Sequence, residues 1–200
     1  MPNTLLYAPA SPYSAKVRLA AAMGGVEIVA QTVSTGDEPD VLVDANPLGK
    51  IPSLILEDGF AVFDSRAIMQ ELDRMSGKVL FPRNAKKRRE AERLEAAADG
   101  LCDALLAQVY EKRFRPEEKV EQSWLDYQAR KVERTLAWLN DNCAMRGKPH
   151  GGHIALACAI GYLELRFPDI DWSRKRPKLK RFMARFAETV PSFDDLKPSA

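Results

Sequence analysis

The sequence predicts an α/β domain over residues 1–80 followed by an all-α helical bundle over residues 84–200. Strand and helix patterns alternate in the first part, and every segment after Phe81-Pro82 has helical periodicity. The charge changes at the same point. Residues 1–80 carry 6 Lys and Arg against 10 Asp and Glu, a net charge of −4, whereas residues 81–200 carry 24 against 18, a net charge of +6. This step supports a domain boundary near Leu80.

The first half of the α/β domain is expected to read strand, helix, strand. The first strand covers about residues 4–8, and the next helix begins at Pro12, because proline is favoured at the first helical position. Gly24-Gly25 ends that helix. Alternation in the second strand predicts three inward-facing side chains: Val26, Ile28 and Ala30.

The second half is expected to contain a short helix, a hairpin and a longer helix. The short helix lies near residues 39–45, and the hairpin covers residues 53–63. Asp58-Gly59 between its apolar runs predicts a two-residue turn. The last helix covers residues 65–77, and Ser65 is predicted to be its N-cap.

The helical domain is expected to contain four main helices. The first stops at Pro116, the second follows an apolar stripe through residues 120–143, and the last begins at Pro177. The third, residues 154–167, is apolar nearly all round and should be the buried central helix of the bundle.

Composition excludes several classes of function. No apolar run is long enough to span a bilayer and no signal peptide is recognisable, so a soluble, cytoplasmic protein without membrane partners is expected. The three cysteines are widely spaced in apolar helical contexts, which predicts buried thiols and neither disulfides nor a metal site: Cys102, Cys143 and Cys158.

Two basic clusters could form nucleic-acid patches, residues 86–89 and residues 174–181. Neither contains interleaved aromatic residues. The first is followed at once by acidic residues, Glu90, Glu92 and Glu95. Solvated helix faces are therefore predicted, and no nucleic-acid partner is expected.

The two-proline segment over residues 46–52 predicts a site for an extended ligand. Pro52 at a strand start favours an edge or a bend, and the Ile51–Pro52 bond is a candidate for the cis form. Such a bend would turn the amide and carbonyl of Ile51 outward, free to pair with a ligand backbone as an added strand does.

The hairpin returns Asp64 and Ser65 to this bend. The first-turn amides of the helix suit a ligand carboxylate, and the Asp64 carboxylate suits an ammonium group. Together they favour the zwitterionic end of an α-amino acid. The alternative is an ordinary hairpin followed by a capped helix, which the spacing fits equally well.

Ser11 follows the first strand and is predicted to be the N-cap of the helix that starts at Pro12. A hydroxyl at the positive end of a helix can donate a hydrogen bond to a bound anion such as a thiolate. A redox dithiol is excluded at this position, because Ser11 and Ser14 occupy the places where the two cysteines would stand.

These segments resemble the glutathione transferase superfamily, which has a thioredoxin-like N-terminal domain and an all-helical C-terminal domain. The resemblance covers essentially the whole chain and rests on three motifs: Asn46-Pro-Leu-Gly-Lys-Ile-Pro52, Asp64-Ser65 and Ser11-Pro-Tyr-Ser-Ala-Lys-Val-Arg18. The stretch Gly161–Trp172 is similar to bacterial members.

The resemblance implies a site for glutathione as co-substrate, with no metal. Ile51, beside the cis-proline Pro52, would pair with the cysteinyl unit, Asp64 and Ser65 would hold the γ-glutamyl end, and Lys50 could meet the glycyl carboxylate. Ser11 would face the sulfur, as in serine-type members, with Tyr7 as the alternative catalytic residue. The family architecture further implies an apolar electrophile pocket lined by five residues: Tyr7, Pro9, Tyr13, Tyr110 and Phe114.

The implied activity is glutathione S-transferase, acting on a small hydrophobic electrophile, and the implied assembly is a homodimer. A binding or regulatory module without turnover, and a glutathione-dependent isomerase or peroxidase, remain open. One departure from the family pattern stands out: His150 and His153 occupy the positions of its usual capping box. A weaker helix start, or a different cap, is expected there rather than a metal pair.

Overall fold

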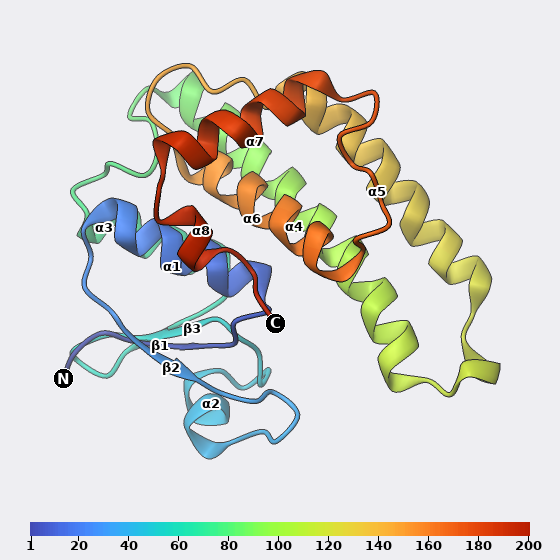
Figure 1. Ribbon diagram of the computed structural model, residues 1–200. Coiled ribbons are helices and arrows are strands. Elements are labelled where there is room, and N and C mark those ends of the chain that lie inside the picture. Colours follow the sequence, from blue (N-terminus) through green and yellow to red (C-terminus); the bar gives the residue numbers. More distant parts are fainter.

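The computed structural model describes residues 1–200 and contains a four-stranded sheet followed by a helical bundle (Figure 1). The elements are β1 (Thr4–Tyr7), α1 (Pro12–Gly24), β2 (Val29–Thr32), α2 (Asp40–Ala45), β3 (Ser53–Ile55), β4 (Ala61–Val62), α3 (Ser65–Met75), α4 (Ala85–Phe114), η1 (Glu117–Lys119), α5 (Gln122–Asn142), α6 (Gly151–Arg166), α7 (Pro177–Thr189) and α8 (Phe193–Leu196). This order confirms the predicted βαβαββα arrangement and the helical bundle after it.

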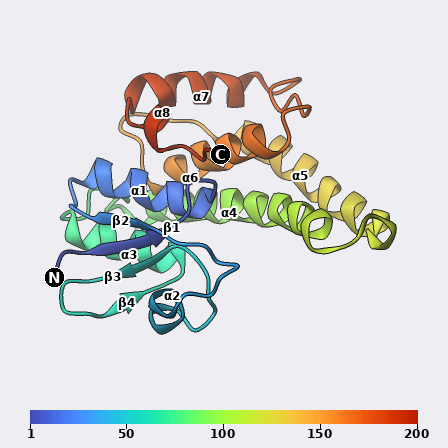
Figure 2. The same cartoon turned by 60° about the horizontal axis from the view of Figure 1, so that its bottom comes forward.

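The sheet has the strand order β2-β1-β3-β4, with β1 parallel to β2 and antiparallel to β3. Helices α1 and α3 cover one face and α2 covers the other (Figure 2). Successive side chains of β1 point to opposite faces of the sheet: Leu5 lies in the main core, and Leu6 packs with Leu42 of α2. The sheet is therefore buried on both sides around its central strand.

Two local predictions for this sheet were wrong. Strand β2 starts at Val29 and all four of its residues are exposed, so Ala30 does not face inward. Because β2 is an edge strand, its alternation does not report a buried face. The hairpin turn has three residues rather than two: Leu56 N–H donates to Phe60 C=O at 2.9 Å, and Gly59 adopts a φ of 87°. A glycine at positive φ is the usual third residue of such a loop.

The two parts of the chain share one core. A cluster of 38 buried hydrophobic residues runs from Leu5 in β1 to Phe193 in α8. Helix α6 lies at its centre, as predicted, and is buried from Gly151 to Leu163. At Gly152 an ideal Cβ would lie 2.4 Å from the carbonyl oxygen of Ala91, so only glycine allows this approach of α6 to α4. All three cysteines are buried and free, as expected.

Helix α6 begins with an unusual histidine pair. The backbone N–H of His150 donates to Nδ1 of His153 at 3.3 Å, and the rings stack with centroids 3.7 Å apart. The acidic residue of a capping box usually accepts this bond. Burial lowers the pKa of His150 to about 4 and that of His153 to about 3. His153 therefore acts as a neutral acceptor, and the helix is capped in a different way, which the sequence left open.

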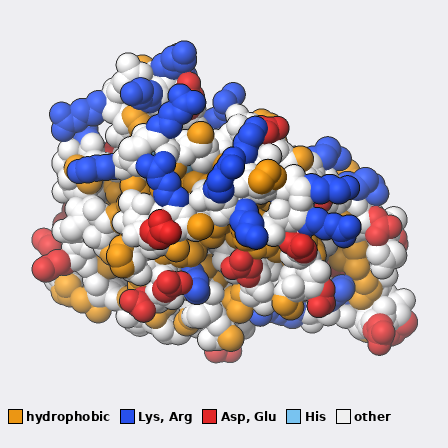
Figure 3. All heavy atoms as spheres, turned by 45° about the horizontal axis from the view of Figure 1, so that its top comes forward, with side chains coloured by type: hydrophobic (Ala, Val, Ile, Leu, Met, Phe, Trp, Pro, Cys, Tyr) orange, Lys and Arg blue, Asp and Glu red, His pale blue; other side chains and the backbone are white.

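The face that carries α7 presents many positive residues. Figure 3 shows Lys and Arg side chains spread over the side that carries α7, where Lys178, Lys180 and Arg181 are exposed. Glu90 is exposed, as predicted for a solvated face, and Glu92 is half-buried, but Glu95 is only 3% exposed and the prediction was wrong for it. No helix is both long and apolar enough to cross a membrane.

Candidate functional site

Three segments of the predicted site lie at one end of the sheet. Strands β1 and β3 are antiparallel with Leu6 opposite Ser53, so the residues after β1 lie beside those before β3. Strand β4 runs back with Val62 opposite Leu54, so the residues after it return to the same end. The register therefore brings together the turn with Ser11, the loop before β3 and the N-terminus of α3.

Ser11 is the N-cap of α1, as the sequence predicts. Its Oγ accepts a hydrogen bond from the Ser14 N–H at 3.2 Å, and Pro12 occupies the first helical position. This bond uses a lone pair of the hydroxyl and leaves its hydrogen available. Ser11 therefore has one donor free for an anion at the positive end of α1.

The Ile51–Pro52 peptide bond is cis. The amide and carbonyl of Ile51, which is half-buried, make no hydrogen bond within the chain. Neighbouring groups hold the loop in shape: the carbonyl of Lys50 accepts from Asn46 Nδ2 at 2.9 Å and from Ser53 Oγ at 3.0 Å. The Lys50 side chain is exposed. A backbone donor and acceptor thus stand ready for an extended ligand.

The N-cap of α3 is Asp64, not Ser65. Oδ1 of Asp64 accepts from the Arg66 N–H at 3.0 Å, and Ser65 is the first helical residue, 5% exposed. Aspartate is as good an N-cap as serine, so the sequence alone did not separate the two. Asp64 is exposed and its Oδ2 has no partner, so half of the carboxylate is free for a ligand ammonium group.

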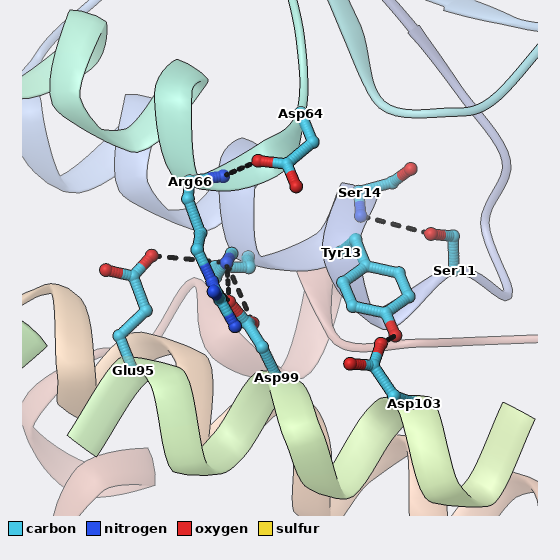
Figure 4. A network of polar contacts seen from close by, with 9 residues as sticks. Ser11, Tyr13, Ser14, Asp64, Arg66, Glu95, Asp99 and Asp103 are labelled. Atoms are coloured by element: carbon cyan, nitrogen blue, oxygen red, sulfur yellow. Dashed lines mark hydrogen bonds and ion pairs between the residues drawn. The ribbon is translucent and has the colours of Figure 1, made fainter. Parts of the chain in front are cut away.

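A buried charge cluster lies beneath this N-terminus and connects the two domains (Figure 4). Lys16 Nζ of α1 contacts Asp99 Oδ1 at 2.8 Å and Glu95 Oε1 at 3.2 Å, both on α4. Arg66 Nε donates to Asp99 Oδ2 at 2.8 Å. Lys16, Glu95 and Asp99 are buried, the condition under which charges interact strongly, whereas the Arg66 side chain is 53% exposed and reaches Asp99 from the solvent side.

Burial and charge act against each other in this cluster. Burial alone would lower the pKa of Lys16, but the Asp99 and Glu95 carboxylates outweigh it and the pKa is raised. Burial raises the pKa of Glu95 against the opposing effect of Lys16. The hydrogen bond to Asp99 raises the pKa of Arg66. Both cations are therefore held in their charged forms.

Sequence reasoning missed this cluster. Glu95 and Asp99 were available as a signal, because they lie four residues apart beside Leu94 and Ala98, inside the apolar stripe of α4. Acidic residues in such a stripe point to a buried cation on a neighbouring element. Only the tertiary structure identifies Lys16 as that cation.

Tyr13, one of the predicted pocket residues, is committed to a contact with α4. Its hydroxyl donates to the carboxylate of Asp103, one turn beyond Asp99 (Figure 4). Burial, with Cys102 and Asp103 nearby, raises the pKa of Tyr13. Tyr13 therefore stays protonated and links the first turn of α1 to α4.

Tyr7 lies on the face of the sheet that carries α1, since it alternates with Leu6, which points to α2. The guanidinium carbon of Arg18 lies 4.7 Å from the centre of its ring. The ring is half-buried beneath that cation. Tyr7 lies close to the Ser11 turn in sequence, but the Arg18 guanidinium already covers one face of its ring.

The remaining pocket residues are spread out. Tyr110 and Phe114 form an edge-to-face pair on α4, 5.1 Å between centroids, and are 41% and 70% exposed. Pro9 lies in the turn before Ser11. A cavity of about 780 Å³ lies instead between α1, β2 and Leu196, and it includes none of the five predicted pocket residues. The electrophile pocket stays a prediction.

Comparison with known proteins agrees with the fold. The family model "Glutathione S-transferase, N-terminal domain" matches residues 10–75, and "Glutathione S-transferase, C-terminal domain" matches residues 90–185. The uncharacterized GST-like protein YibF of Escherichia coli (strain K12) is 33% identical over an alignment that covers 73% of this chain and 77% of YibF.

Two solved structures with glutathione bound are also similar. A glutathione S-transferase from Methylobacillus flagellatus is 37% identical, with a TM-score of 0.91 over 98% of this chain and 100% of that one. A glutathione transferase family member from Pseudomonas fluorescens Pf-5 is 35% identical, with a TM-score of 0.88 over 99% of this chain and 100% of that one. The chain belongs to the glutathione S-transferase family.

Proposed function

We propose that this chain is a glutathione transferase that binds glutathione at the sheet end and directs its thiolate at a small apolar electrophile. One observation carries the proposal. The free hydroxyl donor of Ser11 lies at the same end of the sheet as the unpaired backbone of Ile51 and the half-free carboxylate of Asp64. The glutathione bound to the relatives supports the choice of ligand.

Each part of glutathione has a matching group. The Ile51 amide and carbonyl pair with the cysteinyl backbone. Asp64 binds the γ-glutamyl ammonium, and Ser65 with the first-turn amides of α3 binds its carboxylate. The exposed Lys50 meets the glycyl carboxylate. The thiol is then held at the start of α1, beside Ser11.

Ser11 stabilises the thiolate by a hydrogen bond and does not take its proton. Moving a thiol pKa from about 8.5 to about 6.5 requires about 2.7 kcal/mol, which one charge-assisted hydrogen bond and a helix dipole together supply. The thiol proton passes to water, the sulfur forms a bond to the electrophilic carbon, and the leaving group departs with its electron pair. Positioning and thiolate activation account for the catalysis.

The test is a pH titration of the ultraviolet absorbance of the bound glutathione thiolate. Wild type is expected to show a lowered thiol pKa, Ser11→Ala a pKa raised by about one to two units, and Tyr7→Phe no change. Absence of bound glutathione would overturn the proposal. An unchanged pKa in Ser11→Ala together with a raised one in Tyr7→Phe would transfer the role to Tyr7.

We also propose that the chain forms a two-fold homodimer, with the N-terminal domain of one subunit against the helices of the other. The opposite net charges of the two parts of the chain support this pairing. Phe60, on the hairpin of the N-terminal domain, is 66% exposed. Single exposed rings are common on protein surfaces, so the charge pairing carries this proposal and Phe60 is the residue that tests it.

A further inference from the structure

The C-terminal residues reach the turn that carries Ser11. After α8 the chain leaves the helix, and the Ser199 N–H donates to the Pro9 carbonyl at 3.2 Å. The same turn is closed by the Ser11 N–H, which donates to Ala8 C=O at 3.1 Å. Figure 1 shows the C-terminal end beside the start of α1. The C-terminal residues therefore contact the turn that carries the predicted catalytic serine.

Packing fixes the C-terminal residues to the helical domain. Pro198 is buried. An ideal Cβ built on Gly161 of α6 would lie 3.2 Å from the Cδ atom of Pro198. The tail thus lies directly on the backbone of α6 at a glycine. Just before it, the ring of Phe193 meets Phe186 of α7 edge to face at 5.4 Å. These contacts give the Ser199 amide a fixed position rather than that of a free end.

We propose that residues 197–200 form a positioning segment, which ties the Ser11 turn to the helical domain and so fixes the hydroxyl against the glutathione sulfur. The inference rests on the proposed function. The bond from Ser11 N–H to Ala8 C=O closes the turn, and the N–H groups of Ser14 and Ala15 hold Ser11 to α1. The Ser199 bond adds a backbone constraint on the turn from the C-terminal segment. A charge-assisted hydrogen bond needs its donor placed to within about 0.5 Å, so an added constraint on the turn has a direct effect on the thiolate.

Ser199→Pro removes the N–H at an exposed position, and Ser199→Ala, which keeps it, is the matched reference. Relative to Ser199→Ala, we expect Ser199→Pro to lower kcat/KM with an aryl halide by about five- to tenfold, the usual size of one lost hydrogen bond. The bound thiol pKa should rise, while the affinity for glutathione, which depends on Ile51 and Asp64, should change little.

Amide hydrogen exchange of the Ala8–Ser14 segment gives a second readout that needs no ligand. It is expected to be faster in Ser199→Pro than in Ser199→Ala. Equal exchange and equal thiol pKa in the two variants would overturn the positioning role while leaving the proposed function intact. A wild-type chain that binds no glutathione would overturn the proposed function and with it the role of the segment toward the sulfur.

Gly161→Ala tests the same segment from the side of α6, because its methyl group presses on Pro198. A shifted tail should speed exchange at the Ser11 turn in this variant as well. If the Gly161→Ala protein is folded and the amides of the Ser11 turn exchange at the wild-type rate, the proposal is contradicted.

Discussion

Lys16 of α1 and Asp99 of α4 form an ion pair across the two domains, with Nζ 2.8 Å from Oδ1 and 3.0 Å from Oδ2. Their side chains are only 1% and 7% exposed. The same carboxylate accepts from Arg66, two residues after Asp64. Asp99 therefore links α1, through Lys16, to α3, through Arg66, and α3 is the helix that presents the predicted γ-glutamyl site.

We expect Lys16→Met to lower the free energy of unfolding by about 3 kcal/mol, because it leaves the Asp99 and Glu95 carboxylates buried with only Arg66 to compensate. Urea unfolding followed by circular dichroism measures this loss. Lys178→Met is the matched control, since Lys178 forms an exposed pair with Asp141 at 2.8 Å. Its loss should have a much smaller effect than that of Lys16→Met, because water screens the exposed pair. Equal effects of the two substitutions would mean that burial of the Lys16 pair has no energetic consequence.

The histidine pair predicts a loss of stability in acid. In the unfolded chain each histidine binds a proton near pH 6.5, whereas the folded pKa is about 4 for His150 and about 3 for His153. Because the unfolded state binds more protons in this window, stability is complete above about pH 6.5 and falls as the pH drops toward these folded values. The slope is about 1 kcal/mol per pH unit for each histidine.

His153→Gln isolates this contribution. Glutamine offers a neutral oxygen to the His150 N–H, as in a capping box, but does not titrate. Unfolding measured between about pH 7 and about pH 4 should show a shallower slope in the variant than in wild type. Carboxylates contribute equally to both proteins, so parallel slopes would show that burial of His153 does not control the acid response.

Local signals in the sequence were enough for the cap of α1, the bend at Pro52 and the central helix of the bundle. Proline at the first helical position identified Ser11 as a cap, and the apolar run of α6 identified the central helix. The choice between Asp64 and Ser65 failed because both residues cap well and the preceding backbone decides which one does. The prediction that Glu95 is exposed failed for a different reason: its burial depends on Lys16, which is 79 residues away in the sequence.

The corrected cap of α3 lets stability and binding be separated. Asp64→Asn keeps an oxygen for the Arg66 N–H but removes the charge that we expect to bind the ligand ammonium. It should leave the melting temperature within a few degrees of wild type and weaken glutathione binding about tenfold or more. Asp64→Ala should lose affinity and also about 1 kcal/mol of stability. Calorimetric titration and thermal unfolding measure the two effects, and wild-type affinity in Asp64→Asn would exclude the ammonium contact.

Phe60 tests the proposed dimer. Phe60→Ser should raise the dimer dissociation constant about 30-fold, because a buried aromatic side chain in an interface contributes about 2 kcal/mol. Light scattering across a dilution series measures the change. Phe114→Ser is the control, since Phe114 is 70% exposed against 66% for Phe60 but lies at the far end of α4. Loss of the dimer in Phe114→Ser and not in Phe60→Ser would place the interface on the helical tip, and a monomeric wild type would remove the dimer altogether.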